Sequence, residues 1–261
     1  MSKSFISIKN ISKSYQNSKK ELKKALKDVS LDIFEGEIIA LLGVNGAGKT
    51  TLSSILASLH PPTSGDVIWN GKSIYKDIIS YRKEIGFCPQ KPNLDKLLSI
   101  EENLYFSGTY YGLSKKEIEA RTELLIENLS LSSYRKSSAE ILSGGYKQRF
   151  LIARTLMHNP KFVILDEPTV GLDAHIRRQL WDVIKELKKQ GITVLLTTHY
   201  LDEAEVLSDR VCFIHEGKIY TIDSPENLKK KYQKSCLEDV FLQFLDDSQK
   251  DLFQKSENVD E

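Results

Sequence analysis

The sequence predicts an α/β fold with a mainly parallel sheet, because short apolar runs alternate with segments of helical periodicity. Seven runs have the length and composition of β-strands: residues 5–8, 37–42, 67–69, 162–165, 193–197, 210–214 and 218–221. The clearest helical pattern covers about 174–190 and is stopped by Gly191. Asn70 and Gly71 follow a strand-like run and predict a tight hairpin, so we expect an antiparallel β subdomain as well.

A helical insertion is expected between the strand-rich parts of the chain. Residues 91–140 carry no strand pattern, and Ser114 with Glu117 forms a capping box before apolar residues at helical spacing. The expected organisation is one domain over residues 1–245, with a helical subdomain at about 91–155 inserted in its core.

Composition excludes several classes of protein. Lys and Arg number 37 and Asp and Glu 36, which gives no global electrostatic case for nucleic-acid binding. Lysines gather in residues 1–27 and acids in residues 246–261, and both ends are interpreted as solvated, the second as a polar tail that frays. A basic arm that binds lipid headgroups is the less favoured alternative for residues 1–27, because this stretch also has to form strand and loop near the nucleotide. Cys88, Cys212 and Cys236 have no paired spacing, so neither a disulfide framework nor a zinc site is predicted.

Neither a secretion signal nor an apolar run long enough to span a bilayer is present in the sequence. We therefore expect a cytoplasmic protein, for which any membrane role requires a partner.

The strongest chemical signal is a glycine-rich loop. Residues 43–50 match the P-loop pattern and lie between a predicted strand and a helix-like segment at 51–59. Glycines let successive backbone N–H groups point at phosphates, while Lys49 supplies a point charge and the Thr50 hydroxyl reaches Mg²⁺. An ordinary glycine-rich turn does not need Lys and Thr at these positions. The residues expected to bind nucleotide here are Gly43, Asn45, Gly46, Ala47, Gly48, Lys49, Thr50 and Thr51.

Two acids and a histidine follow other predicted strands. Asp166 and Glu167 end the apolar run at 162–165, which suits a metal ligand and a base beside the attacking water. Two acids at a strand end can also be solvated loop residues, but beside a P-loop the catalytic interpretation is favoured. His199 ends the run at 193–198 and is expected to contact the γ-phosphate or to position the water.

Residues 142–149, Leu-Ser-Gly-Gly-Tyr-Lys-Gln-Arg, resemble the signature motif of ABC ATPases. The same octet could act as a helix-capping turn with Ser143 at the N-cap, and the two roles are compatible. The resemblance implies that Ser143, Gly144 and Gly145 bind a γ-phosphate through a hydroxyl, amides and the helix dipole.

Further positions support this resemblance from Ile6 to about Ser224. Tyr15 resembles the aromatic residue that stacks on adenine, although a surface tyrosine would look the same. Gln90 resembles the glutamine that contacts Mg²⁺ or water and reports to a transmembrane partner. Residues 171–173 resemble the D-loop, which crosses a dimer interface.

Departures from the family pattern are small. Val44, Tyr146 and Ala174 replace residues that are commoner in the family, and none of these changes removes a group with a chemical role. Residues 237–242 resemble the ending of the drug- and lipid-exporter branch, with a simple packing helix as an equal alternative.

The resemblance implies an ATP-binding and ATP-hydrolysing subunit of an ABC membrane transporter, with ATP and Mg²⁺ as cofactors. Each ATP would lie between the P-loop of one copy and the signature of another, so a second ATPase subunit is required, a copy of this chain or a paralogue. A separate multi-spanning permease would anchor it to the cytoplasmic face of the membrane, and export is favoured over import.

Two alternatives remain at the sequence level. A soluble ABC ATPase of DNA repair or translation would carry a long coiled coil or a second cassette, and neither pattern is present. A P-loop kinase or GTPase from outside the family leaves the signature octet unexplained, and the sequence lacks the Asn-Lys-x-Asp string of GTPases.

Overall fold

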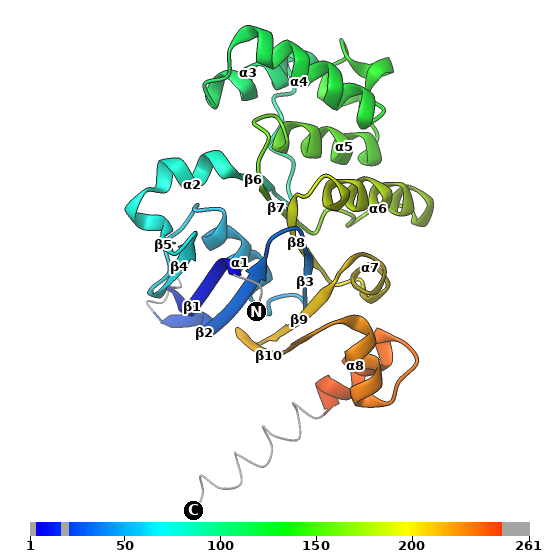
Figure 1. Ribbon diagram of the computed structural model, residues 1–261. Coiled ribbons are helices and arrows are strands. Elements are labelled where there is room, and N and C mark those ends of the chain that lie inside the picture. Colours follow the sequence, from blue (N-terminus) through cyan, green and yellow to red (C-terminus); the bar gives the residue numbers. More distant parts are fainter. Residues whose placement is uncertain (1–3, 17–20, 247–261) are drawn as a thin grey trace, which may run out of the picture.

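The computed structural model describes residues 4–16 and 21–246 of the 261-residue chain. The predicted polar tail therefore lies outside the described residues beyond Asp246. Two β-sheets form the centre of the molecule, and helices α3, α4 and α5 form a separate layer at one end (Figure 1). The fold is α/β with a mainly parallel sheet, an antiparallel sheet and a helical insertion, as predicted.

The larger sheet has six strands in the order β10-β9-β3-β8-β7-β6. Its strands are β3 (Ile38–Leu42), β6 (Ile85–Cys88), β7 (Phe162–Asp166), β8 (Thr193–Thr198), β9 (Arg210–His215) and β10 (Lys218–Asp223). All neighbours are parallel except β9 and β10. Strands β3, β7 and β8 are buried throughout, which explains their unbroken apolar runs. The carboxyl ends of β3, β8, β7 and β6 consequently meet at one edge.

The smaller sheet is antiparallel, in the order β2-β1-β4-β5. Its strands are β1 (Ser4–Gln16), β2 (Leu22–Phe34), β4 (Ser64–Trp69) and β5 (Lys72–Ser73). The predicted hairpin joins β4 to β5, with φ of 49° at Asn70 and 79° at Gly71.

Strand β2 was not predicted, and β1 is longer than the predicted strand at 5–8. Register shifts interrupt the pairing of β1 with β2, so the alternation of apolar and polar residues is broken along both strands. A pattern search that depends on a strict period of two misses such strands.

Eight labelled α-helices lie within the described residues, and a further helical segment covers 237–246. The labelled helices are α1 (Lys49–Leu56), α2 (Ile78–Glu84), α3 (Ile100–Tyr110), α4 (Lys115–Asn128), α5 (Gly144–Thr155), α6 (Ala174–Lys189), α7 (Leu201–Leu207) and α8 (Pro225–Tyr232). The capping box at Ser114 is confirmed, and Ser99 begins α3 with a second one. On α6 the buried stripe includes Leu180, Ile184 and Leu187.

Three buried clusters hold these layers together. Helix α1 packs between the two sheets, where Leu52 and Ile55 join apolar residues from both. Another cluster joins the opposite face of the large sheet to α3, α4, α5 and α6. The third covers β9, and residues 237–246 form a helix on it through Leu237, Phe241 and Phe244. The segment that resembles an exporter ending thus has a packing role.

Within residues 4–16 and 21–246, none of the helices combines the length and the apolar character needed to cross a membrane.

Candidate active site

Four parallel strands end at the same edge of the large sheet and bring Lys49, Gln90, Glu167 and His199 to one pocket. The P-loop follows β3, Glu167 follows β7, His199 follows β8 and Gln90 follows β6. The pocket has a volume of about 950 Å³. Its lining includes the predicted residues Tyr15, Asn45, Gly46, Gly48, Lys49, Thr50, Thr51, Gln90, Glu167 and His199.

The P-loop reaches α1 through a left-handed residue. Gly48 is the N-cap of α1 with φ of 115°, and a Cβ there would lie 2.9 Å from the carbonyl oxygen of Ala25. Only glycine suits this backbone and this spacing. The amides at the start of α1, whose first residue is Lys49, therefore face the pocket as an unsatisfied helix N-terminus suited to phosphate. Gly43 and Ala47 lie outside the pocket lining, as buried supports of the loop.

The Lys49 ammonium and the Glu167 carboxylate form a buried ion pair. Lys49 Nζ lies 3.2 Å from Glu167 Oε1, and it also donates to the carbonyl oxygen of Gly43 at 2.8 Å. Gln90 Nε2 donates to Glu167 Oε2 at 3.0 Å, and His199 Nδ1 lies 3.4 Å from the same oxygen. The three predicted catalytic groups therefore meet at one carboxylate.

Asp166 is buried behind this carboxylate. It accepts a hydrogen bond of 2.5 Å from the Thr197 hydroxyl. Burial raises its pKa, the nearby Glu167 charge adds to the rise, and hydrogen bonds from Thr197, Ser53 and Thr50 oppose it. Glu167 itself adopts φ of 50°, and its N–H is held by the carbonyl and hydroxyl oxygens of Thr197. This strained backbone turns the Glu167 side chain into the pocket.

The donor set suits Mg²⁺ and not zinc. Asp166 and Thr50 offer hard oxygen atoms beside the P-loop, and their side chains are near enough to interact. No group of three or more His, Cys, Asp or Glu side chains gathers as a metal site within the part of the chain that the structure describes. Mg²⁺ usually takes one or two protein ligands and completes its shell with water and phosphate oxygens, so these residues are sufficient.

Although the basic stretch was expected to form strand and loop near the nucleotide, sequence reasoning named none of the lysines on this side of the pocket. Lys23, Lys24 and Lys27 of β2 line it, although the basic amino-terminal stretch was interpreted as a solvated end. Glu216, in the turn between β9 and β10, lines it as well. The lysines lie close together in the sequence, and this clustering was the signal that could have found them.

The turn at Gly217 supports the P-loop from outside. The Gly217 N–H donates to the carbonyl oxygen of Ala47 at 2.9 Å, and the Gly217 carbonyl accepts from the Lys27 N–H at 2.7 Å. Its φ is 76°, and a Cβ would lie 2.5 Å from the carbonyl oxygen of Ala25. Strand β2, the P-loop and this turn therefore share one tightly packed junction.

The signature residues are absent from the lining of this pocket. Ser143 is the N-cap of α5, but its side chain makes no capping hydrogen bond. A Cβ at Gly145 would lie 2.4 Å from Ile176 Cγ2, and one at Gly144 would lie 3.3 Å from Leu172 Cδ2. The glycines of the motif thus let the start of α5 pack closely against the start of α6.

Residues 26–170 match the ABC transporter family, which covers more than half of the chain. The chain belongs to the ABC transporter family. The phospholipid-transporting ATPase ABCA3 of Rattus norvegicus is 41% identical over 227 residues, which are 87% of this chain and 13% of that protein. Human ATP-binding cassette sub-family A member 2 is 40% identical over 87% of this chain and 9% of its own length. The chain therefore spans about an eighth or less of these relatives.

Solved structures of ATP-binding cassettes have the same fold. An ATP-binding subunit of an ABC transporter is 29% identical with a TM-score of 0.80, over 92% of this chain and 98% of that chain. A dimeric cassette in a post-hydrolysis state with ADP and phosphate is also 29% identical, with a TM-score of 0.77, over 84% of this chain and 98% of that chain. These matches confirm the predicted family and favour the transporter interpretation over a soluble repair or translation ATPase.

Replacement of Gly217 by Ala is expected to weaken ATP binding at least about tenfold, because the new Cβ displaces the turn that holds Ala47. Gly71→Ala is the matched control, since Gly71 has a similar φ of 79° but nothing within 4 Å of the added Cβ. Titration with a fluorescent ATP analogue measures both. Equal affinities for the two variants would contradict a supporting role for this turn.

Proposed function

We propose that this chain binds and hydrolyses ATP to power export through a separate transmembrane subunit. The observation that carries the proposal is the convergence of Lys49, Gln90, Glu167 and His199 on one pocket beside a P-loop. Membership of the ABC transporter family and the similarity to a phospholipid-transporting ATPase support transport, and the resemblance of residues 237–242 to an exporter ending favours its outward direction. The substrate itself would be selected by the membrane subunit.

Glu167 would act as the base in hydrolysis. On phosphate binding, the Lys49 ammonium would exchange its contact with Glu167 for the β- and γ-phosphate oxygens and offset their charge. The released carboxylate could then accept a proton from the water that attacks the γ-phosphate in line. Gln90 and His199 would hold the carboxylate and the water in place. The adenine ring of ATP would stack on the exposed ring of Tyr15.

Mg²⁺ would be held by Thr50 and Asp166, with Gln90 next to it, and when bound it would supply charge neutralisation at the β- and γ-phosphates. Asp166 must be ionised for this task. Its hydrogen bonds from Thr197 and from Thr50 stabilise the charged form against the cost of burial.

A second ATPase subunit would complete the site. Ser143, Gly144 and Gly145 lie at a helix N-terminus, as a phosphate site requires, but they do not line the pocket of their own chain. A head-to-tail pair of subunits would bring the signature of each copy to the ATP of the other. The solved cassette with the same fold is dimeric, which supports pairing of two ATPase subunits.

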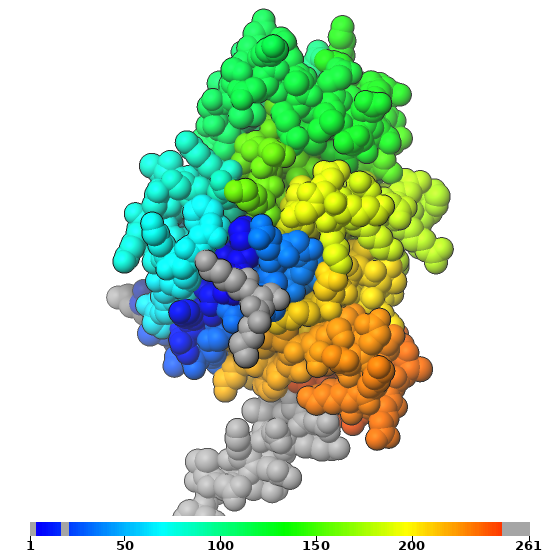
Figure 2. Space-filling view, in the orientation of Figure 1, coloured from blue at the N-terminus to red at the C-terminus, as the bar shows by residue number. Residues whose placement is uncertain are grey.

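A groove beside α3 would receive the permease. It has a volume of about 1080 Å³ and lies between α2 and the helical layer, where Figure 2 shows a hollow. Its rim exposes Ile79 and the α3 residues Phe106 and Tyr110 to solvent by 69%, 56% and 80%. Apolar side chains this exposed, rimmed by Arg82 and Lys83, suit an amphipathic helix of a partner.

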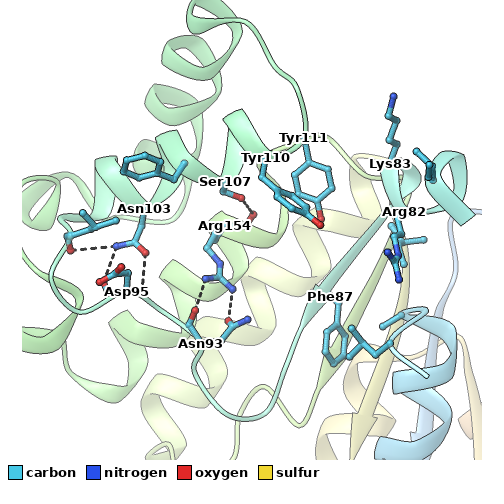
Figure 3. A pocket seen from close by; sticks show the side chains of 16 residues that line it. Arg82, Lys83, Phe87, Asn93, Asp95, Asn103, Ser107, Tyr110, Tyr111 and Arg154 are labelled. Carbon is cyan, nitrogen blue, oxygen red and sulfur yellow. Dashed lines mark hydrogen bonds between the residues drawn. The ribbon is translucent and has the colours of Figure 1, made fainter. Parts of the chain in front are cut away.

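The groove is joined to the active site through strand β6. Phe87 lines the groove and lies three residues before Gln90 (Figure 3). Arg154 of α5 lines it too, and donates to the backbone and the side chain of Asn93. We propose that residues 91–155 form a subdomain within the ATPase domain at 1–245, and that it transmits dimer closure from Gln90 to the permease on the cytoplasmic face.

Glu167→Gln should lower ATP turnover at least about 100-fold, because the amide keeps the shape of the side chain but cannot accept the proton. ATP should still bind and should trap the dimer. Phosphate release and size-exclusion chromatography with ATP measure the two effects. Glu216→Gln, which changes a second acid in the pocket lining, is the control. Near-normal turnover in Glu167→Gln would rule Glu167 out as the base.

Ser143→Arg should abolish ATP-driven dimerisation, because the long side chain fills the space that a partner's γ-phosphate would occupy. ATP binding to the single subunit should be unchanged. Ser133→Arg, at an exposed position of the same helical layer, is the control. Light scattering with ATP measures dimerisation, and a normal ATP-dependent dimer in Ser143→Arg would remove the signature from the site.

Tyr110→Lys should weaken association with a multi-spanning membrane protein while leaving ATP affinity unchanged, because it places a charge on the apolar rim of the groove. Leu242→Lys alters an exposed leucine on the carboxyl-terminal helix and serves as the control. Co-purification from membranes compares the two variants. Equal recovery of the membrane protein with both would exclude this groove as the docking surface.

A further inference from the structure

A series of side-chain contacts, called the stack below although the Tyr200 and His199 rings are tilted by 39°, connects helix α6 to the Glu167 carboxylate. The Arg177 guanidinium carbon lies 4.6 Å from the centre of the Tyr200 ring, and the Tyr200 ring lies 4.4 Å from the His199 ring. The His199 Nδ1 atom lies 3.4 Å from Glu167 Oε2. Three consecutive contacts therefore lead from α6 to the base.

Arg177 is held on its other side by α6 and α7. Its guanidinium carbon lies 5.7 Å from the centre of the Trp181 ring, and its Nη2 atom lies 3.2 Å from Asp202 Oδ2. Trp181 in turn donates from Nε1 to Glu203 Oε1 at 2.9 Å, and Glu203 is fully buried. The guanidinium plane is thus fixed by an aromatic ring and an ion pair, which is the geometry that favours Arg over Lys.

The orientation of His199 depends on this stack. Its Nδ1 atom is buried and has no hydrogen-bond partner among the described residues, so no hydrogen bond from that atom fixes the ring. Within the described residues, the His199 ring contacts the Tyr200 ring and lies beside the Glu167 carboxylate, and both restrain its position. A change in the position of Tyr200 would therefore move the imidazole relative to the site of attack.

The first turn of α6 also contacts the signature turn. Ile176, the neighbour of Arg177, packs where a Cβ on Gly145 would be only 2.4 Å away. The Arg177 N–H donates to the carbonyl oxygen of Asp173, the last residue of the D-loop, at 2.9 Å. One helical turn thus touches the signature, the D-loop and the residue that stacks on His199.

We propose that Arg177 is a positioning residue that orients His199 through the ring of Tyr200. Arg177 lies in the first turn of α6, which also contacts the signature turn. This turn would therefore connect the signature, which would bind the ATP of the partner, to His199, which would act on the ATP of the same chain. The kinetic consequence of this link rests on the proposed function, whereas the orientation of His199 can be measured without ATP hydrolysis.

Nuclear magnetic resonance of the full chain labelled with ¹³C-histidine tests the orientation directly. The chain has five histidines, and the His199 signal is assigned by its loss in His199→Ala. Arg177→Ala should shift the His199 ring resonance, because without its Arg177 contact the Tyr200 ring moves relative to His199, and the ring-current shift at His199 depends on that geometry. Arg178→Ala, an exposed arginine on the same helix, should leave the resonance in place. An unchanged His199 resonance in Arg177→Ala overturns the proposal.

Arg177→Lys separates the stack from the ion pair. Lysine can still reach Asp202 but has no planar group to lie on Tyr200. The His199 resonance should shift as it does in Arg177→Ala. A wild-type resonance in Arg177→Lys would assign the effect to the ion pair and overturn the route through the ring.

A double-mutant cycle tests the kinetic consequence. Arg177→Ala should lower kcat by about tenfold and change the affinity for ATP less than about twofold, because the loss falls on alignment and not on binding. Tyr200→Leu should have a similar effect, and the double variant should be no slower than either single one. If the fold-losses in kcat of the two single variants multiply in the double variant, the proposal is overturned. Failure of the proposed function would instead appear as absence of turnover in the unmodified chain, with the His199 shift retained.

Discussion

The buried contact between Lys49 and Glu167 is the interaction around which the site is arranged. An ion pair removed from water is stable only when its remaining hydrogen-bonding capacity is satisfied. Here the Gly43 carbonyl oxygen supports the ammonium group and the Gln90 amide supports the carboxylate. These partners come from the ends of three different strands, and His199 comes from a fourth. The pair therefore requires the order of the large sheet and explains why distant segments meet at one point.

Much of this site could be predicted because its parts are local in sequence. Each functional group directly follows a buried parallel strand, and the unbroken apolar runs of β3, β7 and β8 are easy to recognise. The position of a residue at a strand end then fixes its edge of the sheet. The P-loop, Asp166 with Glu167, and His199 were found in this way, as were the hairpin at Asn70 and the stripe of α6.

The parts that could not be predicted depend on contacts between residues far apart in sequence. Gly217 hydrogen-bonds to Ala47 although the two are 170 positions apart, and no local sequence pattern at either residue predicts this contact. Strand β2 was hidden because its bulges break the alternation of apolar residues. The signature glycines have a second role, close packing on α6, that appears only when Ile176 is placed next to Gly145.

The separation of the signature from the pocket follows from the same packing. Because α5 packs against α6 through glycines, its first turn lies close to α6, and the Ser143 side chain does not cap that turn. Free amides at a helix N-terminus are suited to an anion. Lys49 and its phosphate cradle lie in a pocket that the signature does not line. An anion bound by both the signature and the P-loop would therefore lie between two copies. The close packing of α5 on α6 would let one copy respond to the nucleotide bound by the other.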